Sequence, residues 1–353
     1  MTIILSLLIA HSVTGAEPIS ADTLMHLPFQ RVAGKSYGDS VLAAGRQGDW
    51  HALYVSTPTV IYDGALYRMW FVGGAPTKDV TVPYGVIEVI GMATSRDGIE
   101  WKMANGGQPV LAPGPRGSAD AKGLAHPFVM QVGKQFWMWY GATDGKTGGD
   151  VGVGPRHVRV ERICLATSVD GVQWERENDG QPVLDIGPPG TADSVQATGM
   201  HIIRRGDEFV MWYGAYNGRH TVTVATSPDG IHWTKENEGN PVTGLEGNQQ
   251  LGPSVYFDGD RYFMLYNKDL HGSWATFSAT SDDGLHWTSA NSGQPILGPP
   301  PPGNFGSAGQ GRNHSVHPSR ILITGNKARV WYGGEDGSPP HQAHIGLMEA
   351  ELP

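Results

Sequence analysis

The sequence contains only one cysteine, so an intrachain disulfide is excluded. That residue, Cys164, lies in the apolar run 162–166, where we expect a small buried side chain. HExxH, Cys-x-x-Cys and Gly-x-Ser-x-Gly motifs are also missing. The glycine-rich run 148–154 lacks the strand-to-helix setting of a phosphate-binding loop. The sequence therefore offers none of the short motifs that mark these common enzyme classes.

Positive charge is scarce, because 25 lysines and arginines stand against 34 aspartates and glutamates, for a formal net charge of −9. We therefore expect neither nucleic acid nor an anionic membrane surface as the main partner. No apolar stretch is long enough for a membrane span. The apolar run 1–10, followed by small residues up to Ala16, is instead typical of a signal peptide, although a basic start is missing. The sequence predicts a secreted or periplasmic protein in which 1–16 is the signal peptide and 17–353 forms a single domain.

Helical periodicity is absent too, whereas 50 glycines and 25 prolines fall at regular positions between runs rich in Val, Trp and Tyr. One phrase, Ala-Thr-Ser-x-Asp-Gly followed by Trp, occurs four times, at 93–101, 166–174, 225–233 and 279–287. An apolar aromatic strand such as Met-Trp-Tyr precedes each copy, and a fifth such strand ends at Tyr332. Repeats with several short strands each are typical of propeller blades.

We therefore predict an all-β fold, a five-bladed β-propeller of four-stranded antiparallel blades. The first blade should have strands at 55–62, 66–72, 85–93 and from Trp101 onward. The Asp-Gly steps suit hairpin turns, and the Trp after each turn should pack between blades. The last blade has a third strand at 344–352 but no fourth, so we expect the N-terminal stretch 24–32 to supply the outer strand and close the ring.

These repeats resemble the five-bladed glycosidase superfamily, which includes glycoside hydrolase families 43, 32/68 and 130. The resemblance covers nearly the whole chain after residue 16. It implies a carbohydrate substrate or ligand at the mouth of the propeller channel. It also implies three carboxylates there, one on the innermost strand of each of the first three blades. The chemistry needs two carboxyl groups flanking a glycosidic oxygen.

Counting back from the aromatic strands places Thr57, His126 and Thr198 at these three positions, so each of the expected carboxylates is absent. The hydrolase interpretation then assigns the acid–base pair to Asp120 and Asp193, which lie where the chain enters the innermost strands. Polar and aromatic residues along these strands would bind the substrate: Tyr54, Thr57, His126, Gln196, Thr198, Gln249 and Arg320.

A second interpretation uses the histidines. His126 and His317 hold equivalent positions in the second and fifth blades, and His314 lies on the same approach. Imidazole suits a divalent metal such as zinc or iron, and an open coordination position would make such a site catalytic. The hydrolase interpretation requires no cofactor.

The leading hypothesis is therefore an exported glycoside hydrolase-like enzyme that acts on an oligo- or polysaccharide at the propeller mouth. Two alternatives stay open on the same scaffold. One is a metal-dependent enzyme that uses the histidines, and the other is a propeller that binds glycan without catalysis. Each single histidine could also be a neutral structural residue held by backbone groups.

Overall fold

The structure, a computed structural model, describes residues 19–153, 157–247, 249–270, 274–297, 317–335 and 342–353. Strands dominate this part of the chain, and its one α-helix is α1 (Ala21–His26). No helix within the described ranges is long and apolar enough to cross a membrane. The predicted signal peptide, 1–16, lies outside them.

Three sheets each contain four antiparallel strands, as predicted. They comprise β6 (Gly123–Val132), β7 (Gln135–Thr143), β8 (Arg162–Ser168) and β9 (Glu175–Arg176); β10 (Gln196–Arg205), β11 (Glu208–Tyr216), β12 (His220–Ser227) and β13 (Thr234–Lys235); and β14 (Gln250–Phe257), β15 (Tyr262–Asp269), β16 (Trp274–Ser281) and β17 (Thr288–Ser289). Short 3₁₀ turns complete the regular structure: Tyr37–Asp39, Pro83–Gly85, Asn105–Gly107, Asn178–Gly180, Asn237–Gly239 and Asn291–Gly293.

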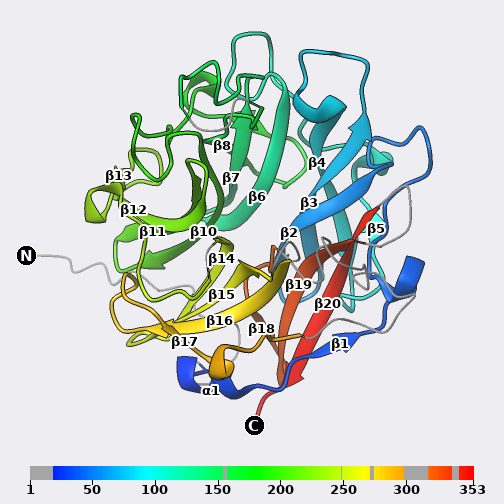
Figure 1. The fold of residues 1–353 in the computed structure, drawn as a ribbon. Helices are drawn as coiled ribbons and strands as arrows, with labels where there is room; N and C mark the ends of the chain where they lie inside the picture. The colour runs from blue at the N-terminus through cyan, green and yellow to red at the C-terminus, as the bar shows by residue number, and fades with distance from the viewer. Residues whose placement is uncertain (1–18, 154–156, 248, 271–273, 298–316, 336–341) are drawn as a thin grey trace, which may run out of the picture.

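A fourth sheet has eight strands. They are β1 (Gln30–Val32), β2 (Tyr54–Tyr62), β3 (Tyr67–Pro76), β4 (Val86–Ser95), β5 (Lys102–Met103), β18 (Leu322–Thr324), β19 (Lys327–Glu335) and β20 (Ala343–Glu351). Two antiparallel groups, β2 to β5 and β18 to β20 with β1, are joined by the parallel pair Tyr54–Ala343, the one ladder contact between them in the described part of the chain. Figure 1 shows the sheets arranged around a common centre, with β2, β6, β10 and β14 nearest to it.

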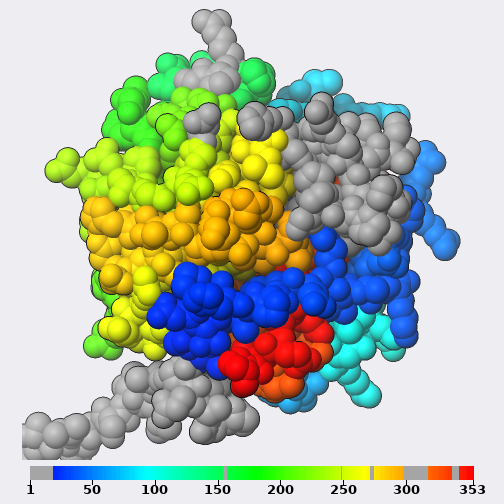
Figure 2. Space-filling model, turned by 60° about the horizontal axis from the view of Figure 1, so that its bottom comes forward, coloured from blue at the N-terminus to red at the C-terminus, as the bar shows by residue number. Residues whose placement is uncertain are grey.

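The prediction of one strand over 24–32 was partly wrong. Residues 21–26 form α1, because the Ser20 hydroxyl accepts a hydrogen bond from Thr23 N (3.0 Å) and caps the helix. The strand β1 covers only 30–32, and it pairs antiparallel with β20. Ala21 N also donates to Asp258 Oδ2 (2.7 Å), which fixes α1 to the sheet of β14–β17. Figure 2 shows this N-terminal segment in blue between that sheet and the red C-terminal strand.

The core lies between neighbouring sheets. Successive side chains of a strand point to opposite faces, so Met138 and Tyr140 of β7 pack against Trp70 on one side. Trp139, between them, packs against Met211 of the following sheet. The Met-Trp-Tyr pattern therefore gives each such strand two buried faces.

The Asp-Gly phrase closes hairpins, as expected. In the first copy, Asp97 Oδ1 accepts hydrogen bonds from Ile99 N (2.8 Å) and Glu100 N (2.9 Å). The glycines adopt positive φ angles, from 78° to 80°. Each glycine carbonyl accepts two indole N–H groups. One comes from the Trp of its own repeat and one from a neighbouring aromatic strand, as for Gly171 with Trp174 (3.0 Å) and Trp70 (2.8 Å).

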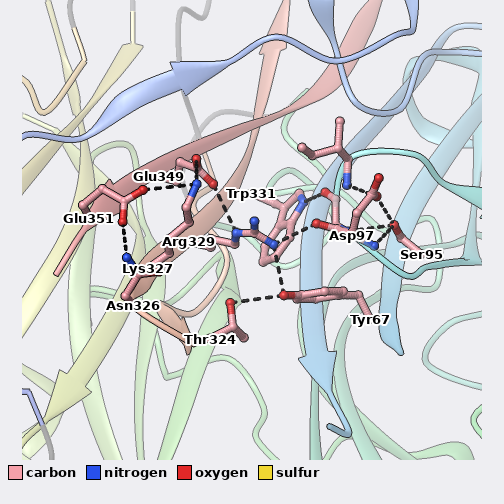
Figure 3. Close-up of polar contacts among 12 residues, drawn as sticks. Tyr67, Ser95, Asp97, Thr324, Asn326, Lys327, Arg329, Trp331, Glu349 and Glu351 are labelled. Carbon is pink, nitrogen blue, oxygen red and sulfur yellow. Dashed lines mark hydrogen bonds and ion pairs between the residues drawn. The ribbon is translucent and has the colours of Figure 1, made fainter. Parts of the chain in front are cut away.

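These paired indoles form four seams, three between neighbouring sheets and one between the two antiparallel groups of the eight-stranded sheet. The two rings meet edge to face at 6.0 to 6.5 Å between centroids: Trp70–Trp174, Trp101–Trp331, Trp139–Trp233 and Trp212–Trp287. Figure 3 shows the seam between β19 and the first repeat, where Arg329 also donates to Asp97 O (2.8 Å) and Tyr67 Oη (3.0 Å). The repeat tryptophans were predicted to pack between blades, and three of the four do pack between neighbouring sheets.

Candidate functional site

Five residues with left-handed backbone surround the centre of the molecule. Four of them sit at β-bulges, where β2, β6, β10 and β14 each shift register against the next strand. Their φ angles lie between 48° and 62°, and we call them the central ring: Thr57, His126, Gly199, Gly252 and His317. A non-glycine residue in this region costs about 1–2 kcal/mol. Such strain is found where a structure must aim particular side chains, as at binding and catalytic sites.

Two cavities, of about 240 and 270 Å³, lie on one side of the central ring. They share His126, Arg159 and His317, and residues that precede the ring along the strands line them. A narrow channel of about 40 Å³ lies on the other side, lined by residues that follow the ring. The central ring therefore separates two roomy cavities from a small channel.

His126 and His317 lie next to each other at this boundary, with ring centroids 4.9 Å apart. Burial lowers the pKa of both imidazoles, that of His317 to well below the usual range. Burial also lowers the pKa of His220, in the second cavity, to about 4. All three histidines are therefore neutral at pH 7, and they can accept as well as donate hydrogen bonds.

Two buried glutamates face each other across one arginine between the cavities. Arg159 donates from Nη1 to Glu88 and from Nε to Glu161. The side chains are 13 % exposed for Arg159, 11 % for Glu88 and 4 % for Glu161. Glu88 also accepts a hydrogen bond from the Tyr54 hydroxyl. Neither the two glutamates nor Arg159 was among the residues predicted from the sequence to form the site.

The protonation of this cluster follows from its contacts. Burial opposes ionisation of Glu161, but Arg159, with smaller contributions from His126 and Thr198, outweighs that effect and lowers the pKa of Glu161. Burial also opposes the charge of Arg159, yet Glu161 and Glu88 together raise the pKa of Arg159. Burial and the neighbouring Glu88 raise the pKa of Tyr54 well above its usual range. Glu161 is therefore ionised, Arg159 is charged and Tyr54 keeps its proton.

Glu88, Glu161 and His220 occupy the same position in three consecutive repeats. Each stands five residues before the alanine of the Ala-Thr-Ser phrase, where the third strand begins. The signal was present in the sequence, since Glu88 interrupts the apolar run 86–90. The count from the aromatic strands located positions on the innermost strands only, whereas these three residues enter the cavities from the third strand of each repeat.

Most of the predicted binding residues do reach the cavities: Tyr54, Thr57, His126, Gln196 and Thr198. Gln196 Nε2 donates to the carbonyl of Arg159 (3.0 Å) and so supports the charged cluster. Gln249 lines neither cavity, although it was predicted to bind substrate. Arg320 lines the small channel beyond the central ring.

The structure places Asp120 and Asp193 away from the cavities, which corrects their assignment as the acid–base pair. Both are fully buried, at 0 % exposure. Asp120 accepts hydrogen bonds from Tyr140 Oη (3.1 Å) and Arg176 Nε (2.8 Å). Asp193 accepts one from Tyr213 Oη (2.9 Å) and pairs with Lys235. The two aspartates hold equivalent places in successive repeats and bind the aromatic strand to the loop that enters each sheet.

Of the three predicted metal ligands, His126 and His317 are adjacent and His314 lies outside the described residues. Within the described ranges no three His, Cys, Asp or Glu side chains are grouped closely enough to hold a metal ion.

The neutral histidines predict a pH dependence of stability. In the unfolded chain histidine titrates near pH 6.5, whereas the pKa of His220 is about 4 in the folded state. Between these values the unfolded state binds more protons, so the free energy of unfolding falls as the pH falls from 6.5 towards 4. His220→Gln should reduce this slope by up to about 1 kcal/mol per pH unit, measured by urea unfolding at each pH. His157→Gln, at an exposed histidine, should leave the slope unchanged.

Comparison with known proteins supports the resemblance found in the sequence, although no family model matches the chain. An uncharacterized protein of Mycobacterium tuberculosis is 28 % identical over 238 residues, 66 % of this chain and 73 % of that protein. A 1,2-beta-oligomannan phosphorylase of Thermoanaerobacter sp. is 28 % identical over 138 residues, 39 % of this chain and 41 % of the phosphorylase.

Solved structures share the fold at lower identity. One comes from the GH130 family of mannoside phosphorylases, which contains glycoside hydrolases that target beta-1,2 mannosidic linkages in Candida mannan. Its TM-score is 0.68 at 16 % identity, over 93 % of this chain and 96 % of the other. The predicted similarity to propeller-like glycosidases is therefore confirmed at the level of the fold.

Proposed function

We propose that this protein is a carbohydrate-active enzyme that cleaves or transfers a glycosidic bond in the two cavities above the central ring. The observation that carries the proposal is the cluster of Glu88, Arg159 and Glu161 between those cavities. Each cavity has one of these carboxylates on its wall, Glu88 in the first and Glu161 in the second, and both also offer neutral histidines and tyrosines, which suits a polyhydroxylated substrate. Beta-1,2-linked mannosides are the first substrates to test, because the relatives' names specify them.

In this proposal Glu88 and Glu161 take the role of catalytic carboxyl groups that the sequence analysis assigned to Asp120 and Asp193. Glycosidic cleavage passes through a transition state with positive charge on the sugar ring. Glu161 is ionised and can stabilise that charge or accept a proton from an attacking hydroxyl group. Glu88 lies on the opposite side of Arg159, within reach of the Tyr54 hydroxyl. Substrate hydroxyls would hydrogen-bond to His126 and His317.

The proposal extends to the architecture and location. The two groups of the eight-stranded sheet, β2–β5 and β18–β20 with β1, would be separate blades, giving five in total. The N-terminal segment, through β1 and α1, would then close the ring. The apolar run 1–10 supports export to the periplasm or the medium.

Glu161→Gln is the decisive test. With beta-1,2-mannobiose and a panel of oligosaccharides and aryl glycosides, each with and without inorganic phosphate, we expect turnover by the unaltered protein. Loss of the charge should lower kcat/KM by about 100-fold or more. Glu175→Gln, an exposed glutamate at the start of β9, is the control and should keep full activity. No turnover by the unaltered protein, or equal turnover by Glu161→Gln, would refute the enzymatic proposal, and saturable glycan binding alone would indicate a binding module.

The metal-dependent alternative rests on the adjacent imidazoles of His126 and His317. Neutral imidazole is a good ligand for zinc or iron. Elemental analysis of untagged protein tests it, since a stoichiometric metal that is lost in His317→Ala would favour this alternative. Metal-free protein with full activity would rule it out.

A further inference from the structure

The channel beyond the central ring contains an arginine that has no acidic partner among the residues described in the structure. Arg320 lines this channel together with Thr59, Phe128 and His201. Its Nη2 donates to Val129 O (2.6 Å), and its guanidinium lies over the Phe128 ring at 4.9 Å. Its Nε is buried and has no hydrogen-bond partner among the described residues.

The two arginines near the centre differ sharply in how their charges are compensated. Arg159 is held between two glutamates, which raise the pKa of its guanidinium. Burial lowers the pKa of Arg320 to about 10, and no carboxylate of the described ranges counters that effect. The stretch 298–316, which leads to this segment, contains neither aspartate nor glutamate. An uncompensated charge in the interior is costly unless a counter-ion or water accompanies it.

We propose that the channel beyond the central ring binds a small monovalent anion, such as chloride, at the guanidinium of Arg320. The channel volume of about 40 Å³ is the space open to the centre of a water-sized sphere, and roughly 10–15 Å³ of such space is enough to hold one body of that size. A sugar or a hydrated phosphate is too large for it. The Nε–H of Arg320 has no acceptor among the described residues, so a bound anion could accept its hydrogen bond. The Thr59 hydroxyl on the channel wall can donate a second hydrogen bond to the same anion.

This anion site is independent of the catalytic proposal. The glutamates lie on the far side of the central ring, and neither lines the channel. Anion binding would compensate a buried charge in the folded state only, so it would stabilise the fold by mass action. Arg320 was predicted from the sequence to bind substrate, and this proposal instead makes it an anion ligand on the side of the central ring away from the two cavities.

Thermal unfolding in sodium chloride and in sodium gluconate at equal ionic strength tests the proposal. We expect a saturable rise in Tm of about 2 °C or more in chloride over gluconate. Arg320→Met should abolish this difference. Arg204→Met is the matched control, because Arg204 also lies over a phenylalanine, Phe209 at 4.5 Å, but on the exposed surface. The control should keep the chloride response of the unaltered protein.

A second measurement needs no variant. Crystals grown or soaked in sodium bromide should show anomalous density beside the Arg320 guanidinium. Equal Tm in chloride and gluconate, an unchanged chloride response in Arg320→Met, or an empty channel in bromide would each overturn the proposal.

Discussion

Arg159→Met is expected to destabilise the protein by about 3–5 kcal/mol, because it removes the one cation that two buried glutamates share. Glu88 and Glu161 would then lie close together as like charges, without the hydrogen bonds from the guanidinium. The pKa of Glu161 would rise, since Arg159 is the main influence that now lowers it. Urea unfolding at pH 7 measures the loss of stability, and activity should be lost as well.

The control is an arginine whose ion pair is exposed. Arg205 pairs with Glu208 at 2.7 Å, and both side chains are about 40 % exposed. Arg205→Met should cost about 1 kcal/mol or less from that pair. Similar costs for the two variants would mean that the central cluster is well solvated, and this would contradict the buried character assigned to it.

Gly171→Ala should destabilise by about 3 kcal/mol. Its φ angle is +79°, which costs an alanine about 1–2 kcal/mol. A Cβ there would also lie 2.7 Å from Trp70 Cζ2, and overpacking of this kind costs about 1–3 kcal/mol. Gly206→Ala separates the two effects, because Gly206 has a φ angle of +62° and nothing within 4 Å of the added Cβ.

The measurement is the midpoint of urea unfolding for both variants. Gly206→Ala should show only the backbone cost, so the difference between the variants reports the clash with Trp70. Equal destabilisation would indicate that the indole moves aside freely, and the seam would then be less tightly packed than described.

The scaffold was predictable because its chemistry repeats. Asp97 and its counterparts turn hairpins, and each repeat tryptophan donates to the glycine of its own turn. These are local interactions between residues three or fewer apart, so one sequence phrase specifies them. The N-terminal segment was harder, since α1 depends on a single cap at Ser20 and on packing against distant residues such as Leu265.

The site was only half predictable. Counting from the aromatic strands located Thr57 and His126, which the structure places in the central ring. The acids were missed because the resemblance directed attention to the innermost strands, whereas Glu88 and Glu161 enter from the start of the third strand. Counting five residues back from each Ala-Thr-Ser phrase would have found them. Asp120 and Asp193 were assigned to the site because a sequence does not show that they accept hydrogen bonds from the buried Tyr140 and Tyr213.

One joint between neighbouring sheets lacks the pair of tryptophans found at the four indole seams, so the joints should not open equally easily. In the fourth repeat, Leu265 occupies the place that a tryptophan holds in each of the other aromatic strands. Leu265 has no N–H to donate, and it packs with Ala21 and Leu24 of α1 in an apolar cluster. This joint therefore depends on apolar packing without an indole hydrogen bond, and part of that packing comes from a six-residue helix. In native-state hydrogen exchange we expect this joint to open first and the four indole seams to separate last.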